Sequence, residues 1–458
     1  MTTITIDDKK VRKKILSMTL PITAENILQM TAGVVSMAMV GRIDSVAVGA
    51  IGMSNILFRI IWAVQKGIGT GNSVFVAQSF GAGNHGKLKD TTEQAFILAL
   101  GISMIFQQLI YWNTESLIGI FNPTPALLAG GTMYLRILSW SLPFTAIILL
   151  TAGILQGMGN AKTPMIIVGV LNGVNIVFSY VLIFGKFGLP ELGLRGAAIA
   201  YNISYGIAAL MGLIVLFGKN GTFAKLGGGF KLRFNRTQAI RLIRFAIPTS
   251  FEMSFWQFAS IIITRAVLTY GEVAYAAYQL GLQAESISYM PAAGFGIAAS
   301  TFVGQSVGSR DSEMGKTYMK HLIRLSLVVT SVAGGLMIVL PSQIMRAFSN
   351  DPEIIAVGAV YLFIMGLLQI PQNFAGLLNG ALRGAGYPKA SMINVGVGLW
   401  LVRVPLVLFM TYVMDAGIEW IWIMMGVDLL VRFILAVFTY RRKDIFNSKK
   451  EALGSIFL

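Results

Sequence analysis

Long apolar stretches alternate with short polar connections along almost the whole chain. An α-helix needs about 20 apolar residues to cross the hydrocarbon core of a bilayer, and these stretches reach that length. No long alternation of apolar and polar residues predicts strands, and an open sheet edge is not viable in lipid. We therefore predict an all-α polytopic membrane protein. Its twelve transmembrane helices are expected at roughly 14–41, 46–79, 93–113, 128–155, 163–186, 193–218, 240–269, 274–306, 317–341, 354–382, 388–414 and 418–440.

The composition agrees with this pattern and narrows the chemistry. Of the 458 residues, 55% are hydrophobic and only 12% are charged, and the mean hydropathy is +0.70. Soluble chains carry about 25% charged residues. The chain has no cysteine, and its two histidines, His85 and His321, fall in polar stretches between apolar runs. Because neither a thiolate metal site nor a hydrolase triad can be assembled, we predict that the protein is not an enzyme and uses no cofactor.

The formal charge of +16 is explained by where the basic residues lie. Most of the 36 Lys and Arg residues lie in the two tails and in alternate connections, whereas the opposite connections hold Arg42, Lys186, Arg195 and Arg346. An excess of Lys and Arg marks cytoplasmic loops, so both termini are expected on the cytoplasmic side of the inner membrane. The charge therefore predicts contact with the lipid bilayer rather than a nucleic-acid partner. The first apolar run is too long for a signal-peptide core and is expected to be retained.

One stretch occurs twice at a constant offset. PITAENILQM…FVAQSFG, from residue 21, matches PTSFEMSFWQ…FVGQSVG, from residue 248. Further downstream, Leu155-Gln-Gly-Met-Gly matches Leu382-Arg-Gly-Ala-Gly at the same offset. A register held this long indicates duplication of a whole half. Because each copy has an even number of helices, the halves are predicted to be parallel repeats related by a pseudo-twofold axis along the membrane normal.

The repeat also sets the predicted domain organisation. We expect a cytoplasmic tail at 1–13, an N-lobe at 14–218, a cytoplasmic linker at 219–239, a C-lobe at 240–440 and a cytoplasmic tail at 441–458. The glycine run at 227–229 is expected to let the two lobes move relative to each other. A short amphipathic helix at 236–245, lying on the inner leaflet, is an alternative or an addition.

Two glutamates inside predicted spans are the leading candidates for function. Glu25 and Glu252 are repeat-equivalent, and each follows a proline, Pro21 or Pro248, by four residues. The prolines are expected to act as structural kinks that free a backbone carbonyl one turn earlier. Intramembrane carboxylates are costly and by default functional. We therefore predict a Na⁺ or H⁺ site at an unpaired Glu252 or at Glu25, while a purely structural hydrogen bond for each glutamate remains the alternative.

Other ionisable and glycine-rich positions carry weaker signals. Glu285 lies within the eighth predicted span, and two roles are equally consistent with this position. It either forms an ion pair with Arg59 or another basic residue, or it contacts a substrate. Asp428 and Arg432 are four residues apart on the last helix and predict a local ion pair. The stretch Gly67-Ile-Gly-Thr-Gly lies mid-span without a preceding strand, so it predicts close helix packing rather than nucleotide binding.

These features resemble the multidrug and toxic compound extrusion (MATE) family, within the multidrug/oligosaccharidyl-lipid/polysaccharide exporter superfamily. The similarity is carried by TLPITAENILQ, VSMAMVGRIDSVAVGAIG, LQGMGNAKTP, NIVFSYVLIFG, PTSFE and LNGALRGAGYPK, and covers roughly residues 14–440. The resemblance implies two six-helix lobes arranged as a V. It also implies a monomeric antiporter that exports small organic, often cationic, compounds by alternating access, driven by a Na⁺ or H⁺ gradient.

The chain departs from this family at positions that are often acidic. Ser36 stands in the first span, Ser179 in the fifth and Gln372 in the tenth, where many or certain members have an acid. With Asn175, these residues are assigned to the same ion or substrate cavity. A flippase for a lipid-linked saccharide is the main alternative, because an anionic substrate would suit basic residues inside spans. Those residues are Arg59, Lys66, Arg136, Arg265 and Arg403. A membrane scaffold or receptor without transport is a third reading.

Overall fold

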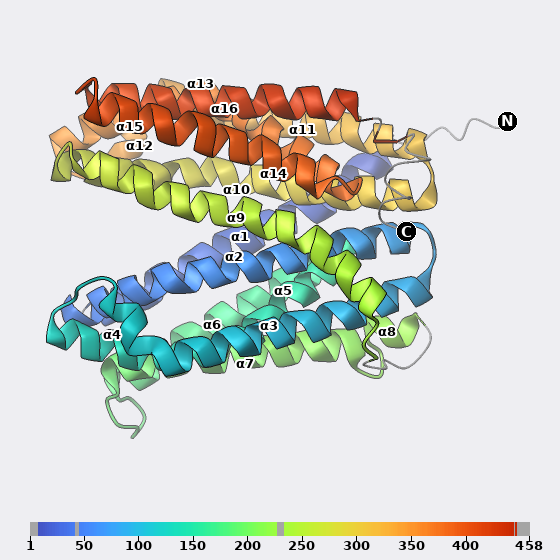
Figure 1. Cartoon of the computed structure of the whole chain (residues 1–458), viewed down its shortest axis with the longest axis horizontal. Coiled ribbons are helices and arrows are strands. Elements are labelled where there is room, and N and C mark those ends of the chain that lie inside the picture. Colours follow the sequence, from blue (N-terminus) through green and yellow to red (C-terminus); the bar gives the residue numbers. More distant parts are fainter. Residues whose placement is uncertain (1–7, 42–44, 227–232, 444, 447–458) are drawn as a thin grey trace. The chain divides into compact units, whose positions relative to one another are not determined.

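The computed structural model describes residues 8–41, 45–226, 233–443 and 445–446, without the side chains of residues 30–38 and 45. These residues are almost entirely helical (Figure 1). The first repeat contains α1 (Asp8–Val40), α2 (Ser45–Gly81), α3 (His85–Gly119), α4 (Pro125–Leu138), η1 (Ser139–Ser141), α5 (Leu142–Gly157), α6 (Lys162–Phe184), α7 (Gly193–Phe217) and α8 (Thr222–Lys225). The second contains α9 (Arg236–Leu268), α10 (Glu272–Ser309), α11 (Ser312–Val339), α12 (Pro341–Arg346), α13 (Pro352–Gly384), α14 (Pro388–Gly396), η2 (Val397–Arg403), α15 (Val404–Tyr412) and α16 (Ile418–Arg442).

The predicted all-α fold is confirmed, and each predicted span corresponds to a helix or to a run of consecutive helices. The fourth span is α4, η1 and α5 in succession, and the eleventh is α14, the π-helix η2 and α15. The alternative of a separate amphipathic helix at 236–245 is wrong, because these residues form the first turns of the continuous helix α9. The predicted glycine run at 227–229 lies outside the described residues.

Within the described residues, nine helical segments are long and apolar enough to cross a membrane. The long helices α1, α9 and α10 are not among them. These three helices carry Glu25, Glu252 and Glu285, respectively. The three buried glutamates of the candidate site therefore lie on helices outside these nine segments.

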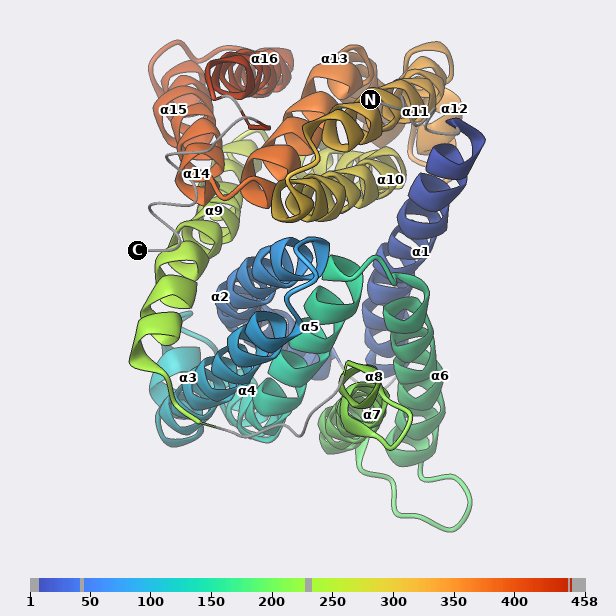
Figure 2. The same ribbon diagram turned by 90° about the vertical axis from the view of Figure 1, so that its right-hand side faces the viewer.

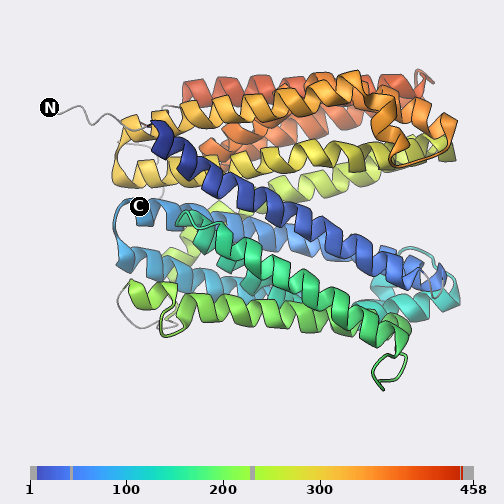
Figure 3. The ribbon, with the colours of Figure 1, turned by 180° about the vertical axis from the view of Figure 1, so that it is seen from behind.

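The described contacts divide the chain into two compact units, one of residues 24–250 and one of residues 1–23 with 251–458. The predicted lobes at 14–218 and 240–440 differ from these units in how α1 and α9 are divided. The unit boundaries fall inside both helices, two residues after Pro21 and two after Pro248. Since these points are equivalent under the repeat, the same division of the leading helix occurs in each half. Figure 3 shows α1 as one unbroken helix.

In each unit, a glycine lets a neighbouring helix pack closely against a segment of α1 or α9. In the unit of residues 24–250, a Cβ at Gly67 of α2 would lie 2.6 Å from the Ser250 backbone of α9. In the other unit, a Cβ at Gly294 of α10 would lie 3.2 Å from the carbonyl oxygen of Thr19 of α1. Gly67 and Gly294 are repeat-equivalent, so both copies use a glycine to admit a neighbouring backbone.

A second glycine contact is also repeated, and it joins the helices that frame the site. In one unit, a Cβ at Gly153 of α5 would lie 2.6 Å from the Gly69 carbonyl oxygen of α2, and these helices lie side by side (Figure 2). In the other unit, a Cβ at Gly380 of α13 would lie closer than 3.0 Å to the Gly296 carbonyl oxygen of α10. The predicted role of the mid-span glycines in close packing is confirmed at Gly69.

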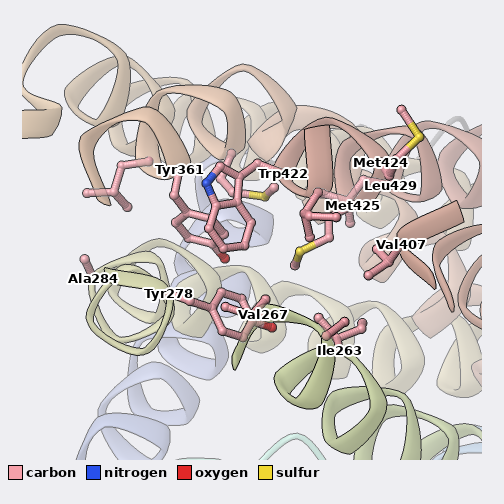
Figure 4. Packing of buried hydrophobic residues seen from close by; sticks show 14 of the residues in the cluster. Ile263, Val267, Tyr278, Ala284, Tyr361, Val407, Trp422, Met424, Met425 and Leu429 are labelled. Atoms are coloured by element: carbon pink, nitrogen blue, oxygen red, sulfur yellow. The ribbon is translucent and has the colours of Figure 1, made fainter. Parts of the chain in front are cut away.

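An aromatic core in the unit of residues 1–23 and 251–458 supports one face of the candidate site. Trp422 of α16 stacks on Tyr278 of α10, with ring centres 5.3 Å apart, and meets Tyr361 of α13 edge-on at 5.0 Å (Figure 4). Trp422 and Tyr361 are fully buried. Aromatic pairs prefer offset-stacked or edge-to-face arrangements, so this packing orients the Tyr361 ring.

Candidate functional site

Glu252 has a cationic partner, which its sequence context does not reveal. Its Oε1 accepts a hydrogen bond from Arg383 Nη1 at 2.6 Å, and its Oε2 accepts one from Ser391 Oγ at 2.8 Å. Arg383 Nη1 also donates to Ser391 Oγ at 3.1 Å. The three side chains come from α9, α13 and α14 and form a closed, buried triangle. The expectation that Glu252 is unpaired is therefore wrong.

Glu25 is surrounded by neutral donors instead. Gln156 of α5 donates to its Oε2 at 3.0 Å, and Gln29, one turn further along α1, donates to its Oε1 at 3.4 Å. Lys66 of α2 interacts with Glu25 electrostatically, but among the described ion pairs none joins the two residues. Glu25 is only 4% exposed, so it is a buried carboxylate without a cation in direct contact.

The partners of the two glutamates are themselves repeat-equivalent. Gln156 and Arg383 occupy the second position of the matching motifs Leu-Gln-Gly-Met-Gly and Leu-Arg-Gly-Ala-Gly, at the offset of the repeat. The same contact is therefore made twice, once with an amide and once with a guanidinium. The sequence analysis missed both partners because the predicted spans ended at residues 155 and 382, one residue too early. The repeated motif was the signal that could have found them.

Glu285 is the third buried carboxylate, and it has two neutral partners. Tyr361 donates its hydroxyl to Oε2 at 2.5 Å, and Gln369 donates to Oε1 at 3.5 Å. Within the described part of its own unit, no ion pair involves Glu285. The alternative of pairing with a basic residue of this unit is therefore not what the structure shows. Glu285 is 7% exposed and is held between α10 and α13.

Gln369 connects Glu285 to a wider polar network between α10, α11 and α13. Its Oε1 accepts a hydrogen bond from Ser288 at 2.8 Å, and its Nε2 donates to Gln372 Oε1 at 3.3 Å. Asn373 also donates to Gln369 Oε1, at 3.4 Å. The predicted cavity residue Gln372 thus lies beside this network. The centre of the network is Gln369, which is fully buried and which the sequence analysis did not identify.

The predicted polar residues of the fifth span lie in α6. Asn175 is buried and donates to Ser204 of α7 at 3.2 Å. Ser179 is buried, and among the described residues its hydroxyl oxygen has no hydrogen-bond partner. Such an orphaned oxygen is available to a bound ion or water. The side chain of Ser36 lies outside the described residues, so its assignment stays a prediction.

The predicted pair of Asp428 and Arg432 is confirmed as part of a larger cluster. Asp428 Oδ2 lies 2.6 Å from Arg432 Nη2 and 2.7 Å from Arg403 Nε. Both guanidinium groups face the ring of Trp256, with centres 4.5 Å and 5.5 Å from the ring centre. A Cβ at Gly398 of the π-helix would lie closer than 3.0 Å to Arg432 Cγ, so glycine lets η2 approach the cluster. This arrangement is a packed structural ion cluster.

The chemistry of these carboxylates suits a single small cation more than a multidentate metal site. Among the described residues, no group of three His, Cys, Asp or Glu side chains could hold a metal ion, so a multidentate metal site is not indicated. Glu25 and Glu285 each combine a buried carboxylate with neutral amides or a hydroxyl, which suits a proton or Na⁺. Occupancy of Glu252 or Glu25 by Na⁺ stays a prediction.

A duplicated helical fold with apolar spans and buried glutamates defines a polytopic membrane transporter. The MatE family profile matches residues 21–181 and 248–409, so the chain belongs to the MatE family of transporters, which are not enzymes. The two matched segments begin at the two equivalent prolines, Pro21 and Pro248, as the repeat predicts.

Individual relatives agree with this assignment. The chain is 31% identical to the probable multidrug resistance protein NorM of Thermotoga maritima, covering 93% of this chain and 91% of that protein. It is 28% identical to the probable multidrug resistance protein YoeA of Bacillus subtilis, covering 93% of each. A MATE protein crystallised with MaD3S shares the fold, with a TM-score of 0.86 at 19% identity, covering 94% of this chain and 96% of that one.

Proposed function

We propose that this protein is a secondary active antiporter that exports organic, amphipathic cations across the cytoplasmic membrane in exchange for Na⁺ or H⁺. The multidrug resistance names of its relatives support drug-like substrates. The observation that carries the proposal is a set of buried glutamates, two of them at equivalent repeat positions, in the helices of a MatE-family transporter. Intramembrane carboxylates mark ion and substrate pathways because burying them is costly.

The coupling follows from linkage between two ligands. If the ion and the substrate favour opposite conformations, each shifts the equilibrium on which the other depends. In the proposed cycle, Glu25 and Glu285 bind the ion because neither is in direct contact with a cation. Export then requires no chemistry beyond ion exchange at these carboxylates.

The residues at the usual acidic positions of the family narrow the choice of ion. Ser36, Ser179 and Gln372 can ligate Na⁺ through oxygen, but none of them carries a proton near neutral pH. This favours either Na⁺ coupling or proton coupling that uses glutamates alone. The orphaned hydroxyl of Ser179 supports an oxygen ligand of this kind.

The basic residues inside the spans support the flippase alternative less well than the antiporter. An anionic saccharide lipid needs uncompensated positive charge, but Arg403 is paired with Asp428 and Lys66 interacts with Glu25. Arg136 faces the ring of Tyr111, with its guanidinium centre 5.6 Å from the ring centre. Two of the five basic residues inside spans therefore have an acidic partner or neighbour, which weakens the case for an anionic substrate.

The test is uptake of a fluorescent lipophilic cation into proteoliposomes, under a Na⁺ gradient and separately under a pH gradient. We expect one gradient to drive uptake, and we expect Glu25→Gln and Glu285→Gln each to reduce the driven component at least about 10-fold, as loss of a buried charged partner does. Glu115→Gln is the matched control, because Glu115 is an exposed acid on α3. Uptake that ignores both gradients would overturn the antiporter, and driven uptake that survives both glutamate substitutions would remove these glutamates from the mechanism.

A further inference from the structure

We propose that Arg383 is a resident counter-ion that keeps Glu252 out of ion coupling. The side chain at the repeat-equivalent positions 156 and 383 would then decide whether a buried glutamate can bind the coupling ion. This inference rests on the proposed antiporter and assigns its ion to Glu25 and Glu285. It replaces the sequence-based assignment of the ion to Glu252.

The contacts of Glu252 include a direct ion pair with a resident cation. Both carboxylate oxygens are engaged, one by Arg383 and the other by Ser391. The Arg383 side chain is 12% exposed and that of Glu252 is 6% exposed, so solvent screens the pair little. Buried ion pairs are strongly coupled, and removing one partner leaves an uncompensated charge.

The charge balance at Glu252 also opposes ion entry. With Arg383 in place the pair is neutral, so a bound Na⁺ or proton would add a net positive charge in a low-dielectric site. The ion could bind only after Arg383 withdrew from a contact of 2.6 Å. Arg383 is held in place by a second hydrogen bond to Ser391.

Glu25 makes the same contact without the charge. Gln156 and Gln29 each donate an amide hydrogen to one carboxylate oxygen, and neither brings a positive charge into contact with it. The ammonium of Lys66 lies 5.9 Å from the ring centre of Trp62, and no described ion pair places it on Glu25. An ion that binds this carboxylate therefore displaces neutral amides rather than a paired guanidinium.

The first arm of the test measures binding and needs no transport. Arg383→Gln copies the Gln156 environment at Glu252, so the freed carboxylate should take up one additional Na⁺ or proton. At 100 times its dissociation constant an added ion shifts the folding equilibrium about 100-fold. We expect the apparent Tm of Arg383→Gln to depend more steeply on Na⁺ or pH than that of wild type, by the equivalent of one additional bound ion. The double variant Glu252→Gln/Arg383→Gln should lose this gain.

The second arm measures coupled uptake in proteoliposomes. Glu252→Gln alone should be impaired, because it leaves Arg383 buried without its carboxylate. The double variant removes both charges together and should restore gradient-driven uptake to within about 3-fold of wild type. The reciprocal change Gln156→Arg should install the counter-ion at Glu25 and reduce driven uptake at least about 10-fold.

The outcomes separate this inference from the proposed function. If the double variant binds substrate but no longer responds to either gradient, Glu252 is a coupling residue and the inference is overturned. If Arg383→Gln gains no additional ion or pH dependence in its Tm, the counter-ion role is also overturned, whether or not wild type transports. If wild type itself shows no driven uptake, the antiporter fails and the binding arm alone decides the role of Arg383.

Discussion

Replacing Gly380 by alanine is expected to force apart the two helices that hold Glu285. A Cβ at Gly380 of α13 would lie closer than 3.0 Å to the Gly296 carbonyl oxygen of α10, whereas ordinary van der Waals contact begins at 3.4 Å. The opposing atom belongs to a helix backbone, which cannot rotate away as the end of a flexible side chain can. The same helices carry Tyr361 and Glu285, so the strain reaches the site.

The magnitude follows from two opposing terms. Overpacking of a close interface costs about 1–3 kcal/mol, and a backbone obstacle places this change at about 3 kcal/mol. Alanine recovers about 0.5–1 kcal/mol of helix stability relative to glycine. The net destabilisation is therefore about 2 kcal/mol. A cooperative unit of 150–250 residues loses about 2–4 °C of Tm per kcal/mol, which gives a decrease of about 4–8 °C.

The measurement is thermal unfolding of the detergent-solubilised protein, at one scan rate because unfolding of such proteins is often irreversible. Gly376→Ala is the matched control, since it lies one turn earlier on α13 and a Cβ there meets nothing within 4 Å. We expect this control to be neutral or slightly stabilising. If Gly380→Ala and Gly376→Ala unfold within about 1 °C of each other, the close backbone contact does not limit stability and the reasoning is wrong.

Two further predictions concern charged contacts. Asp428→Asn leaves Arg403 and Arg432 without their shared carboxylate and should cost about 3–5 kcal/mol, seen as a lower apparent Tm or a lower yield of monodisperse protein. Glu419→Gln, an exposed acid on the same helix, is the control, and equal behaviour of the two would refute the structural role. At the first turn of α1, Asp8 Oδ1 lies 3.0 Å from His321 Nε2, and this hydrogen bond lowers the pKa of Asp8 below its ordinary value of 3.8. The contribution of Asp8 to stability is therefore present above that ordinary value and is lost as the pH falls through the lowered pKa. The Tm difference between wild type and Asp8→Asn should shrink in acid, and a pH-independent difference would contradict this.

The helical architecture was predictable because it depends on local information. Apolar length alone located the spans, and a constant offset revealed the duplication before any contact was known. Boundaries were less accurate because helices extend into polar residues that pack against neighbours. This error had a consequence at Arg383, which the sequence analysis placed just beyond a helix although it lies within α13.

The partners of the glutamates depend on tertiary packing. Position within the repeat identified Glu25 and Glu252, but it could not show that one contacts an amide and the other a guanidinium. For Glu285, the hydrogen bond from Tyr361 joins residues 76 apart on different helices, and no local pattern encodes it. The division of α1 near Pro21 likewise appears only when contacts are compared.

The balance of buried charges in the second repeat bears on the proposed exchange of an ion for a cationic substrate. The buried or nearly buried ionic side chains described in its unit are Glu252, Glu285 and Asp428 with Arg383, Arg403 and Arg432. Acids and bases are equal in number, so these groups together are neutral, although Asp428 has two arginines and Glu285 has none. An uncompensated buried charge costs several kcal/mol, so two added positive charges are opposed more strongly than one. In the proposed antiporter, an ion at Glu285 and a cationic substrate nearby would therefore exclude each other electrostatically, and such mutual exclusion is what an exchanger requires.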